Sequence, residues 1–468
     1  MSGILAVPSP IATSVTEKVL HAEGDWSFAR LKPSQTLWGP HGYHRYPAKF
    51  IPQLVRRIIE EYSTPGSLVG DPFLGSATTA IEALRAGRAF WGADINPVAL
   101  LISKAKCNPL DPTTLNNSWR WLNAQLNALP RIGRRTITKT EKASILAINI
   151  ARASSKERLA YWFPAAHRRV IKQQLQLITR LRNPDVRTFL LCAFSNILRG
   201  CSIWISGSTK PQKDLDKILS DPVDSFRRQV RDMIRRNEVY HTDLIQANVD
   251  LGLLKSRCAI ELQDARCLQL GDGHLDLIVT SPPYATCYQY LEIHQLTQLW
   301  FEKHQIIEPK DLRQACIGGK GISARKQCAD DSSTGSEAAD YALSRLASWR
   351  NGQASHDIDR EIRALRYYFQ DMRATIKEMA RVLAEGKYLV LIVGDSSKRG
   401  INIPTSAALS EMATASGFEL QRKIVRKVPA RVLVSTRDKK TGRFSSVERS
   451  DTQVYPEEDI LIFKRSRF

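Results

Sequence analysis

Apolar and polar positions near the start of the chain predict two strands separated by a helix. The run at residues 67–71 predicts a strand, and the small residues at 72–79 predict a tight loop. Residues 80–86 have helical spacing, and residues 89–94 predict a second strand that ends in Asp94. Open α/β sheets use this order to hold a nucleoside at the carboxyl ends of their strands, where an acid suits the ribose hydroxyls.

Strand patterns return in the second half of the chain. Residues 259–263 and 275–279 predict strands, and so do residues 388–395 and 458–463. Residues 360–383 have the spacing of a long helix. We therefore expect an α/β fold with helices on both faces of the sheet.

Helical spacing without strand signals dominates the middle of the chain. Residues 119–126 and 168–178 show it, and the more apolar residues 188–198 predict a buried helix that anchors this region. A chain of 468 residues is also longer than one ordinary core requires. We expect an N-terminal arm, a sheet domain in two parts and a mainly helical basic insertion, at residues 1–30, 31–110 with 251–468, and 111–250.

The positive charge of the chain is concentrated in two segments. The whole chain carries a formal charge of +21, of which residues 131–240 contribute 23 Lys and Arg against 9 Asp and Glu. Residues 421–468 contribute 13 against 6, and the remainder is neutral. Cationic segments outside a neutral sheet suit a nucleic-acid partner whose phosphates they contact. Solvated helix faces of a basic protein are the alternative.

Several classes of protein are disfavoured by the composition. No stretch approaches the roughly 20 apolar residues of a membrane helix, and the start lacks the pattern of a secretory signal. The 8 cysteines show no C-x-x-C spacing and no histidine cluster accompanies them, so we expect no metal site. We expect a soluble cytoplasmic protein without a membrane partner.

A rigid polar and aromatic corner follows the strand at 275–279. Its sequence is Thr280-Ser-Pro-Pro-Tyr284, in which Pro282 and Pro283 fix φ and lack backbone donors. The carbonyls of the corner can therefore accept hydrogen bonds from another group, and Tyr284 can offer a ring face. Such a corner is suited to gripping a planar amine.

Three segments together resemble the amino-group DNA methyltransferases. They are Asp71-Pro-Phe-Leu-Gly-Ser-Ala-Thr-Thr79, the corner at 280–284, and His44-Arg-Tyr-Pro-Ala-Lys-Phe50. The resemblance implies a Rossmann-like methyltransferase sheet, S-adenosylmethionine as cofactor and double-stranded DNA as substrate. In this family, serine before the two prolines is associated mainly with cytosine N4 and aspartate mainly with adenine N6. Ser281 therefore favours cytosine N4.

The resemblance also implies roles for individual residues. The hydroxyl of Ser281 and the carbonyl of Pro282 would accept the hydrogens of the amine, Pro283 would stiffen the corner, and Tyr284 would stack on a base flipped out of the duplex. Asp264 would contact the adenine amine of the cofactor, although a helix cap is an alternative role. The cofactor-binding residues implied are Ala48, Lys49, Phe50, Asp71, Pro72, Phe73, Gly75, Ser76, Thr78, Thr79, Asp94, Asn96, Asp264, Ala265 and Thr280.

Three other functions stay open from the sequence. The first is methylation of adenine N6, and the second is methylation of a guanine amine in RNA, because related loops occur in such enzymes. The third is a non-catalytic nucleic-acid binder, because the family commonly has glycine where this chain has Ala77. We expect base-reading residues in the insertion or in a mobile loop at 303–350, and a cognate restriction endonuclease or defence-system component as a further partner.

Overall fold

A computed structural model provides the structure of the chain. It describes the following residues: 26–46, 49–206, 208, 211–285, 290–308, 312, 315–318, 333–348, 356–428, 436–437, 452–453 and 457–466. Residues 1–25 of the arm expected at 1–30 lie outside this part. Trp26, which follows them, is buried under the guanidinium of Arg57, 3.8 Å from the ring centroid.

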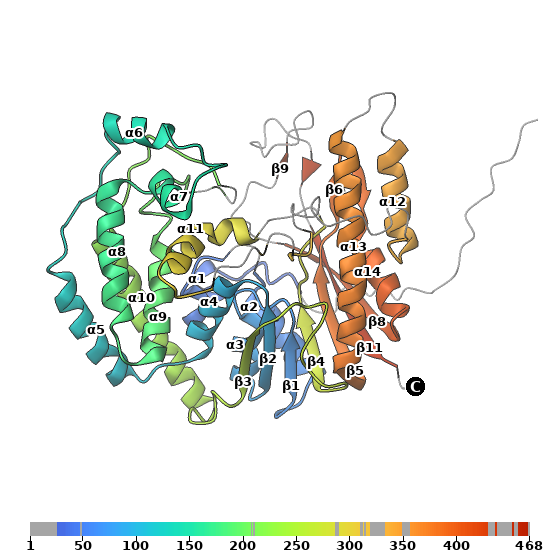
Figure 1. The fold of residues 1–468 in the computed structure, drawn as a ribbon. Coiled ribbons are helices and arrows are strands. Elements are labelled where there is room, and N and C mark those ends of the chain that lie inside the picture. Colours follow the sequence, from blue (N-terminus) through green and yellow to red (C-terminus); the bar gives the residue numbers. More distant parts are fainter. Residues whose placement is uncertain are drawn as a thin grey trace, which may run out of the picture.

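A seven-stranded sheet forms the centre of the molecule, in the order β3-β2-β1-β4-β5-β11-β8 (Figure 1). The strands from β3 to β5 run parallel, and β11 runs antiparallel to both β5 and β8. The fold class expected from the sequence is confirmed. The strands are β1 (Leu68–Asp71), β2 (Ala89–Asp94), β3 (Cys258–Leu262), β4 (Leu275–Thr280), β5 (Leu383–Val393), β8 (Phe418–Lys427) and β11 (Glu457–Arg465).

Alternate residues of the central strands face two different apolar layers. Leu277 and Val279 of β4 pack with helices α2 (Pro52–Tyr62) and α3 (Thr78–Arg85). Ile278 packs on the opposite face with three further helices. Because side chains alternate along a strand, this pattern buries both faces of the sheet. The helices of the second face are α12 (Glu337–Ser348), α13 (His356–Val382) and α14 (Thr405–Thr414).

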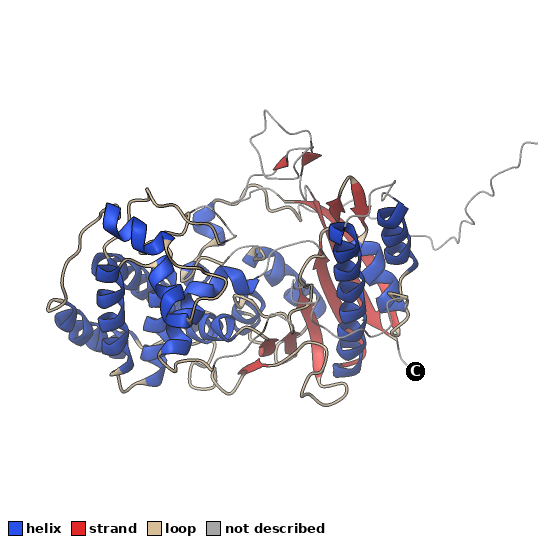
Figure 2. Ribbon diagram, turned by 45° about the horizontal axis from the view of Figure 1, so that its top comes forward, coloured by secondary structure: helices blue, strands red, loops and turns tan. Residues whose placement is uncertain are grey.

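Helices also make up the region between β2 and β3, beside the sheet (Figure 2). Several of them begin at capping residues: Asn183 and Asp221 accept backbone N–H groups at the starts of α9 and α10, and Ser154 forms a capping box at α7. The helices are α4 (Pro97–Cys107), α5 (Pro112–Leu126), α6 (Lys139–Leu146), α7 (Ser155–Trp162), α8 (Ala165–Thr179), α9 (Pro184–Ile197) and α10 (Pro222–Gln246).

The helical region shares its core with the elements around the sheet. Helix α9 is buried, with Phe189 and Phe194 inside the same apolar cluster as Ile102 of α4. Trp300 of α11 (Tyr290–Lys303) and Tyr43 belong to this cluster as well. The domain division expected from the sequence stays a prediction, and the packing shows that its parts are joined by a continuous core.

One expected loop contains a helix. Residues 337–348, within the segment predicted as a loop at 303–350, form α12. Its buried residues Ala339, Leu343 and Leu346 have helical spacing and pack with α13 and α14, so tertiary burial outweighs the Gly- and Ser-rich context. Residues 319–332 lie outside the described residues. The remaining elements are short: α1 (Pro33–Thr36), a 3-10 turn (Gly39–Gly42), β6 (Ser396–Lys398), β7 (Ile401–Ile403), β9 (Thr436–Arg437) and β10 (Thr452–Gln453).

Candidate cofactor and catalytic site

The loop after β1 and the corner after β4 meet at one edge of the sheet. The two strands are parallel neighbours, with Gly70 opposite Ile278, so their carboxyl ends lie side by side. Thr280 Oγ1 donates a hydrogen bond to Asp71 Oδ1 at 2.7 Å. Thr79 Oγ1 donates to Asp71 Oδ2 at 2.8 Å. Two segments about two hundred positions apart are therefore joined through one carboxylate.

Asp71 is a buried scaffold for this junction. Its side chain is almost fully buried, and the backbone N–H of Phe73 donates a third hydrogen bond, at 3.0 Å. Burial raises the pKa of Asp71 to about 6, while hydrogen bonds from Thr280, Thr79 and Phe73 act in the opposite direction. Because both carboxylate oxygens have donors, Asp71 holds the loops together.

The loop itself needs two left-handed residues. Gly75 has φ of 51° and Ala77 has φ of 63°. A Cβ at Gly75 would lie 3.5 Å from the ring of Tyr46, so this turn also packs closely under the segment before α2. For Ala77 the left-handed conformation costs about 1–2 kcal/mol, which explains why glycine suits this position.

Asp94 lies at the end of β2, as the sequence predicts, and borders the same loop. Its Oδ2 accepts from the backbone N–H of Gly75 at 2.9 Å, and its Oδ1 accepts from that of Asn96 at 2.8 Å. Burial raises the pKa of Asp94 to about 6. Asn96 caps α4 by accepting from the N–H of Val98, and its Nδ2 lies 3.0 Å from His294 Nδ1. The Asn96 side chain is thus engaged within the protein.

Two polar side chains of helix α4 form hydrogen bonds to the backbone of the loop after β1. Ser103 Oγ donates to the carbonyl of Gly75, and Lys106 Nζ donates to the carbonyl of Ser76, both at 3.1 Å. Lys106 is fully buried, and burial lowers its pKa to about 8. Neither residue was predicted from the sequence, although a serine and a lysine three apart in an apolar helix were a usable signal.

The segment before α2 approaches the same region. Lys49 Nζ donates to the carbonyl of His41 at 2.6 Å, and burial followed by the charge of Lys106 lowers the pKa of Lys49 to about 6. Phe50 is half-buried against the α2 and α3 face of the sheet. Ala48 lies outside the described residues.

A polar network attaches this segment to α9 and α11. His44 Nε2 lies 3.0 Å from Ser195 Oγ, which lies 2.7 Å from Thr297 Oγ1. The ring of Tyr46 packs against His294, 5.1 Å between centroids. Sequence reasoning missed these contacts, because the residues are far apart in the chain.

The other residues expected to bind the cofactor differ in their burial and in their hydrogen bonds. Ser76 Oγ is buried and has no hydrogen-bond partner among the described residues. Asp264 forms an ion pair with Arg266, 2.5 Å from Oδ2 to Nη2, and Arg266 also pairs with Asp371 at 2.7 Å. The contact of Asp264 with a cofactor amine stays a prediction. Pro72, Thr78 and Ala265 are buried, and Phe73 is half-buried.

The corner at 280–284, which the sequence predicts to be catalytic, presents a partly exposed surface. Pro282 is buried, whereas Ser281, Pro283 and Tyr284 are half-buried. The hydroxyl of Tyr284 donates to Glu458 Oε1 at 3.0 Å. The expected residues at 280–284 therefore lie together at the carboxyl end of β4, next to the loop that Asp71 anchors.

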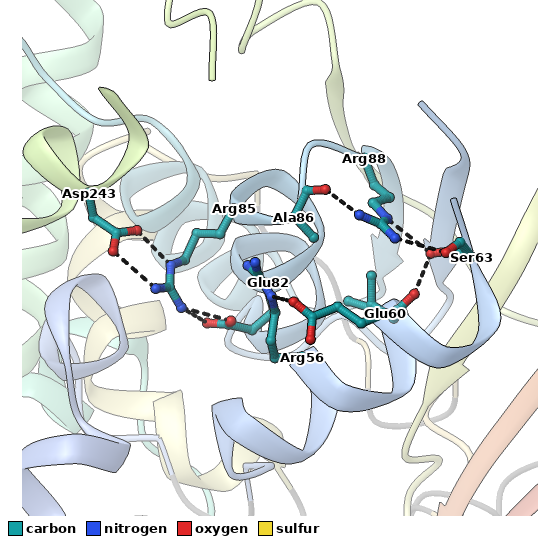
Figure 3. A network of polar contacts seen from close by, with 9 residues as sticks. Arg56, Glu60, Ser63, Glu82, Arg85, Ala86, Arg88 and Asp243 are labelled. Atoms are coloured by element: carbon teal, nitrogen blue, oxygen red, sulfur yellow. Dashed lines mark hydrogen bonds and ion pairs between the residues drawn. The ribbon is translucent and has the colours of Figure 1, made fainter. Parts of the chain in front are cut away.

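An ion-pair network fixes α3, the helix that starts in the loop after β1, to α10 (Figure 3). Arg85 pairs with Asp243 of α10 through two hydrogen bonds of 2.8 and 3.1 Å, and with the buried Glu82 at 2.9 Å. His41 Nε2 lies 2.8 Å from Glu82 Oε1, and burial lowers the pKa of His41 to about 4. The guanidinium of Arg85 also lies over Trp38, with Cζ 4.1 Å from the ring centroid.

Two classes of feature are absent from the described part of the chain. No group of three His, Cys, Asp or Glu side chains there could hold a metal ion. Across the same residues, no helix combines the length and apolar character that crossing a membrane requires. Cys287, three residues after the corner, lies outside the described residues.

Comparison with known proteins finds sequence similarity to DNA methyltransferases. The profile of the N6_N4_Mtase family, described as DNA methylase, matches residues 13–105. The type II methyltransferase M.MvaI of Kocuria varians is 26% identical over 408 residues, 83% of this chain and 84% of that protein. The DNA adenine methyltransferase YhdJ of Escherichia coli is 38% identical over 71 residues, 15% of this chain and 22% of that protein.

A solved SAM-dependent methyltransferase of Methanosarcina mazei overlaps 88% of this chain and 98% of its own, with 10% identity and a TM-score of 0.29. The sequence matches support the resemblance to the amino-group methyltransferases and leave the methylated atom open. Residues 13–105 are therefore similar to the N6_N4_Mtase family, and most of the chain is similar to a type II methyltransferase.

Proposed function

We propose that this chain is a site-specific DNA methyltransferase that transfers a methyl group from S-adenosylmethionine to the exocyclic N4 of a flipped-out cytosine. The observation that carries the proposal is the hydrogen bond from Thr280 to Asp71, because it joins the cofactor-type loop to the catalytic corner. The relatives named as type II and DNA adenine methyltransferases support DNA as the substrate.

Residues at the edge of the sheet fit the cofactor. The unpartnered hydroxyl of Ser76 provides a donor inside the loop, and Asp94 provides a carboxylate at the end of β2 for the ribose hydroxyls. Lys49 and Phe50 belong to the segment that would cover the methionine part. When bound, the cofactor supplies an electrophilic methyl group on a sulfonium.

The corner prepares the amine for methylation. An exocyclic amine is a poor nucleophile because its lone pair is delocalised into the base. The hydroxyl of Ser281 and the carbonyl of Pro282 accept its two hydrogens and so direct the lone pair outward, while Tyr284 stacks on the ring. The described residues around the corner supply position and electrostatics for in-line transfer. The N–C bond forms as the bond between sulfur and the methyl carbon breaks, and the methylated amine then releases one proton to solvent.

A cationic surface on α7, α8 and α11 suits the DNA backbone. Lys156 of α7, Arg168 and Lys172 of α8, and Lys303 of α11 form what we call the α7–α8–α11 patch. Burial, followed by the charges of Arg168, Lys156 and Lys172, lowers the pKa of Lys303, so the four cations lie close together. Among the described residues no carboxylate forms an ion pair with any of them, which leaves them available for phosphates.

Adenine N6 is the second candidate target. The similarity to a DNA adenine methyltransferase favours it, whereas serine rather than aspartate at position 281 favours cytosine N4. The expected restriction endonuclease or defence-system partner and the expected cellular location both stay predictions. The RNA and non-catalytic alternatives are separated by labelled methyl transfer to DNA and to RNA, and by calorimetry with the cofactor.

The deciding experiment identifies the modified nucleoside. The chain is expressed in cells that lack DNA methylation, and their DNA is digested and analysed by mass spectrometry. N4-methylcytosine that disappears with Ser281→Ala or Tyr284→Ala, while DNA binding is retained, is the expected result. N6-methyladenine would replace the proposed target with the second candidate. Absence of any modified nucleoside in DNA would overturn the proposal.

A further inference from the structure

The hydroxyl group of Tyr284 is bonded to a strand that is not a neighbour of β4 in the sheet. The residue follows β4, whereas Glu458, which accepts its hydroxyl hydrogen at 3.0 Å, lies at the start of β11. Strand β5 separates β4 from β11. The side chain therefore reaches across the carboxyl end of β5.

The backbone of β5 leaves room for the ring at this point. Gly394 follows the last residue of β5, and a Cβ built on it would lie 3.5 Å from Cε2 and 3.7 Å from Cζ of Tyr284. These are ordinary van der Waals distances, so one edge of the ring faces the side of Gly394 on which a side chain would project. The ring is thus placed beside Gly394, and its hydroxyl is bonded to Glu458.

Glu458 is itself held in place. Its register partner on β8 is Arg426, whose Nε lies 3.8 Å from Glu458 Oε2. The Arg426 side chain is only 3% exposed and that of Glu458 is 20% exposed. The carboxylate therefore directs one oxygen toward the arginine and the other toward the tyrosine.

We propose that Glu458 is a positioning residue for methyl transfer, which fixes the plane of the Tyr284 ring against which the flipped base stacks. The inference rests on the proposed function. A tyrosine side chain without an anchor samples several χ1 rotamers, and stacking requires one of them. Hydrogen bonds to charged groups are strong enough to select that rotamer before the base arrives.

Four variants test the inference. Glu458→Ala removes the acceptor, Tyr284→Phe removes the donor, and Glu458→Gln keeps an amide oxygen that can accept the same bond. Glu457→Ala is the matched control, because its exposed side chain points to the other side of the strand. Each variant is assayed for kcat and for the KM of cofactor and DNA on a duplex that contains the mapped recognition sequence.

We expect Glu458→Ala and Tyr284→Phe each to lower kcat roughly tenfold, with little change in the KM of the cofactor. The double variant should lose no more than either single variant, because both remove one bond. Glu458→Gln should recover activity to within about threefold of the parent, and Glu457→Ala should match the parent.

A fluorescent base reports the ring position directly. With 2-aminopurine at the target position, stacking on Tyr284 quenches the flipped base. Glu458→Ala should raise its fluorescence toward the value of Tyr284→Ala, and Glu457→Ala should not. Equal kcat and fluorescence for Glu458→Ala and the parent would overturn the inference, as would full additivity in the double variant. A parent protein with no methylation activity would instead overturn the proposed function.

Discussion

Thr280→Val tests the junction between the two loops most directly. The substitution keeps the branched shape of a fully buried side chain and removes the hydroxyl that donates to Asp71 Oδ1 at 2.7 Å. A hydrogen bond to a charged group contributes about 1.5–3 kcal/mol, and one between neutral groups about 1 kcal/mol. At pH 8, where Asp71 with a pKa of about 6 is ionised, the free energy of unfolding should fall by about 2 kcal/mol.

The loss should depend on pH. The pKa of Asp71 is raised from 3.8 to about 6, so between these values the folded protein holds a proton that the unfolded chain has released. Asp71 therefore makes the protein less stable as the pH rises through this window, and its contribution is constant above it. At pH 5 Asp71 is mostly protonated and the bond is neutral, so Thr280→Val should cost only about 1 kcal/mol. The difference corresponds to a further rise of roughly 0.7 in the Asp71 pKa.

Urea unfolding followed by tryptophan fluorescence at pH 5 and pH 8 measures both values. Thr297→Val is the matched control, because Thr297 is also buried and its partner Ser195, at 2.7 Å, is uncharged. The control should lose about 1 kcal/mol at both pH values. If Thr280→Val behaved in the same way at both pH values, Asp71 would not be its acceptor and the reasoning about the joined loops would fail.

Three further perturbations have defined outcomes. Ala77→Val should lower the free energy of unfolding by about 3 kcal/mol, because a branched side chain strains a left-handed, fully buried position. Ala77→Gly should stay within about 1 kcal/mol of the parent, and urea unfolding compares the two variants. Arg85→Met removes the guanidinium that pairs with the buried Glu82 and should lower the free energy of unfolding by about 3 kcal/mol, measured in the same way. A loss under about 1 kcal/mol would contradict the role of the ion-pair network between α3 and α10. Lys172→Gln and Lys303→Gln together neutralise two cations of the α7–α8–α11 patch. The slope of log affinity for DNA against log salt concentration should fall by about 2, while cofactor affinity stays unchanged. An unchanged slope would exclude the patch from phosphate contact.

The sequence predicted the parts of the fold that have a strong period. The strands that end in Asp71, Asp94 and Thr280 are apolar and short, and all three occur where expected. Strand β8 was not predicted, because the adjacent cations Arg422 and Lys423 interrupt the alternation of its apolar and polar residues. Its pairing along β11 supplies the missing stabilisation.

The site was predictable where the chain itself places residues together. The loop after β1 and the corner after β4 each form from contiguous residues, so a motif reveals them. Lys106 was missed, because lysine is rarely buried and its partner, the carbonyl of Ser76, is 30 positions away in the chain. Glu458 was not predictable either, because 174 positions separate it from Tyr284.

The core shared by α4, α9 and α11 limits how this protein can be redesigned. Ser195 and Asn196 of the helical region bond to His44 and to the backbone of Arg45, and Gln229 bonds to the carbonyl of Tyr43. A chimaera that exchanged residues 111–250 for the equivalent part of another enzyme would break these bonds and expose apolar surface. To change the target specificity of this protein, point substitutions on the solvent-facing side of the helical region are therefore preferable to replacement of the whole region.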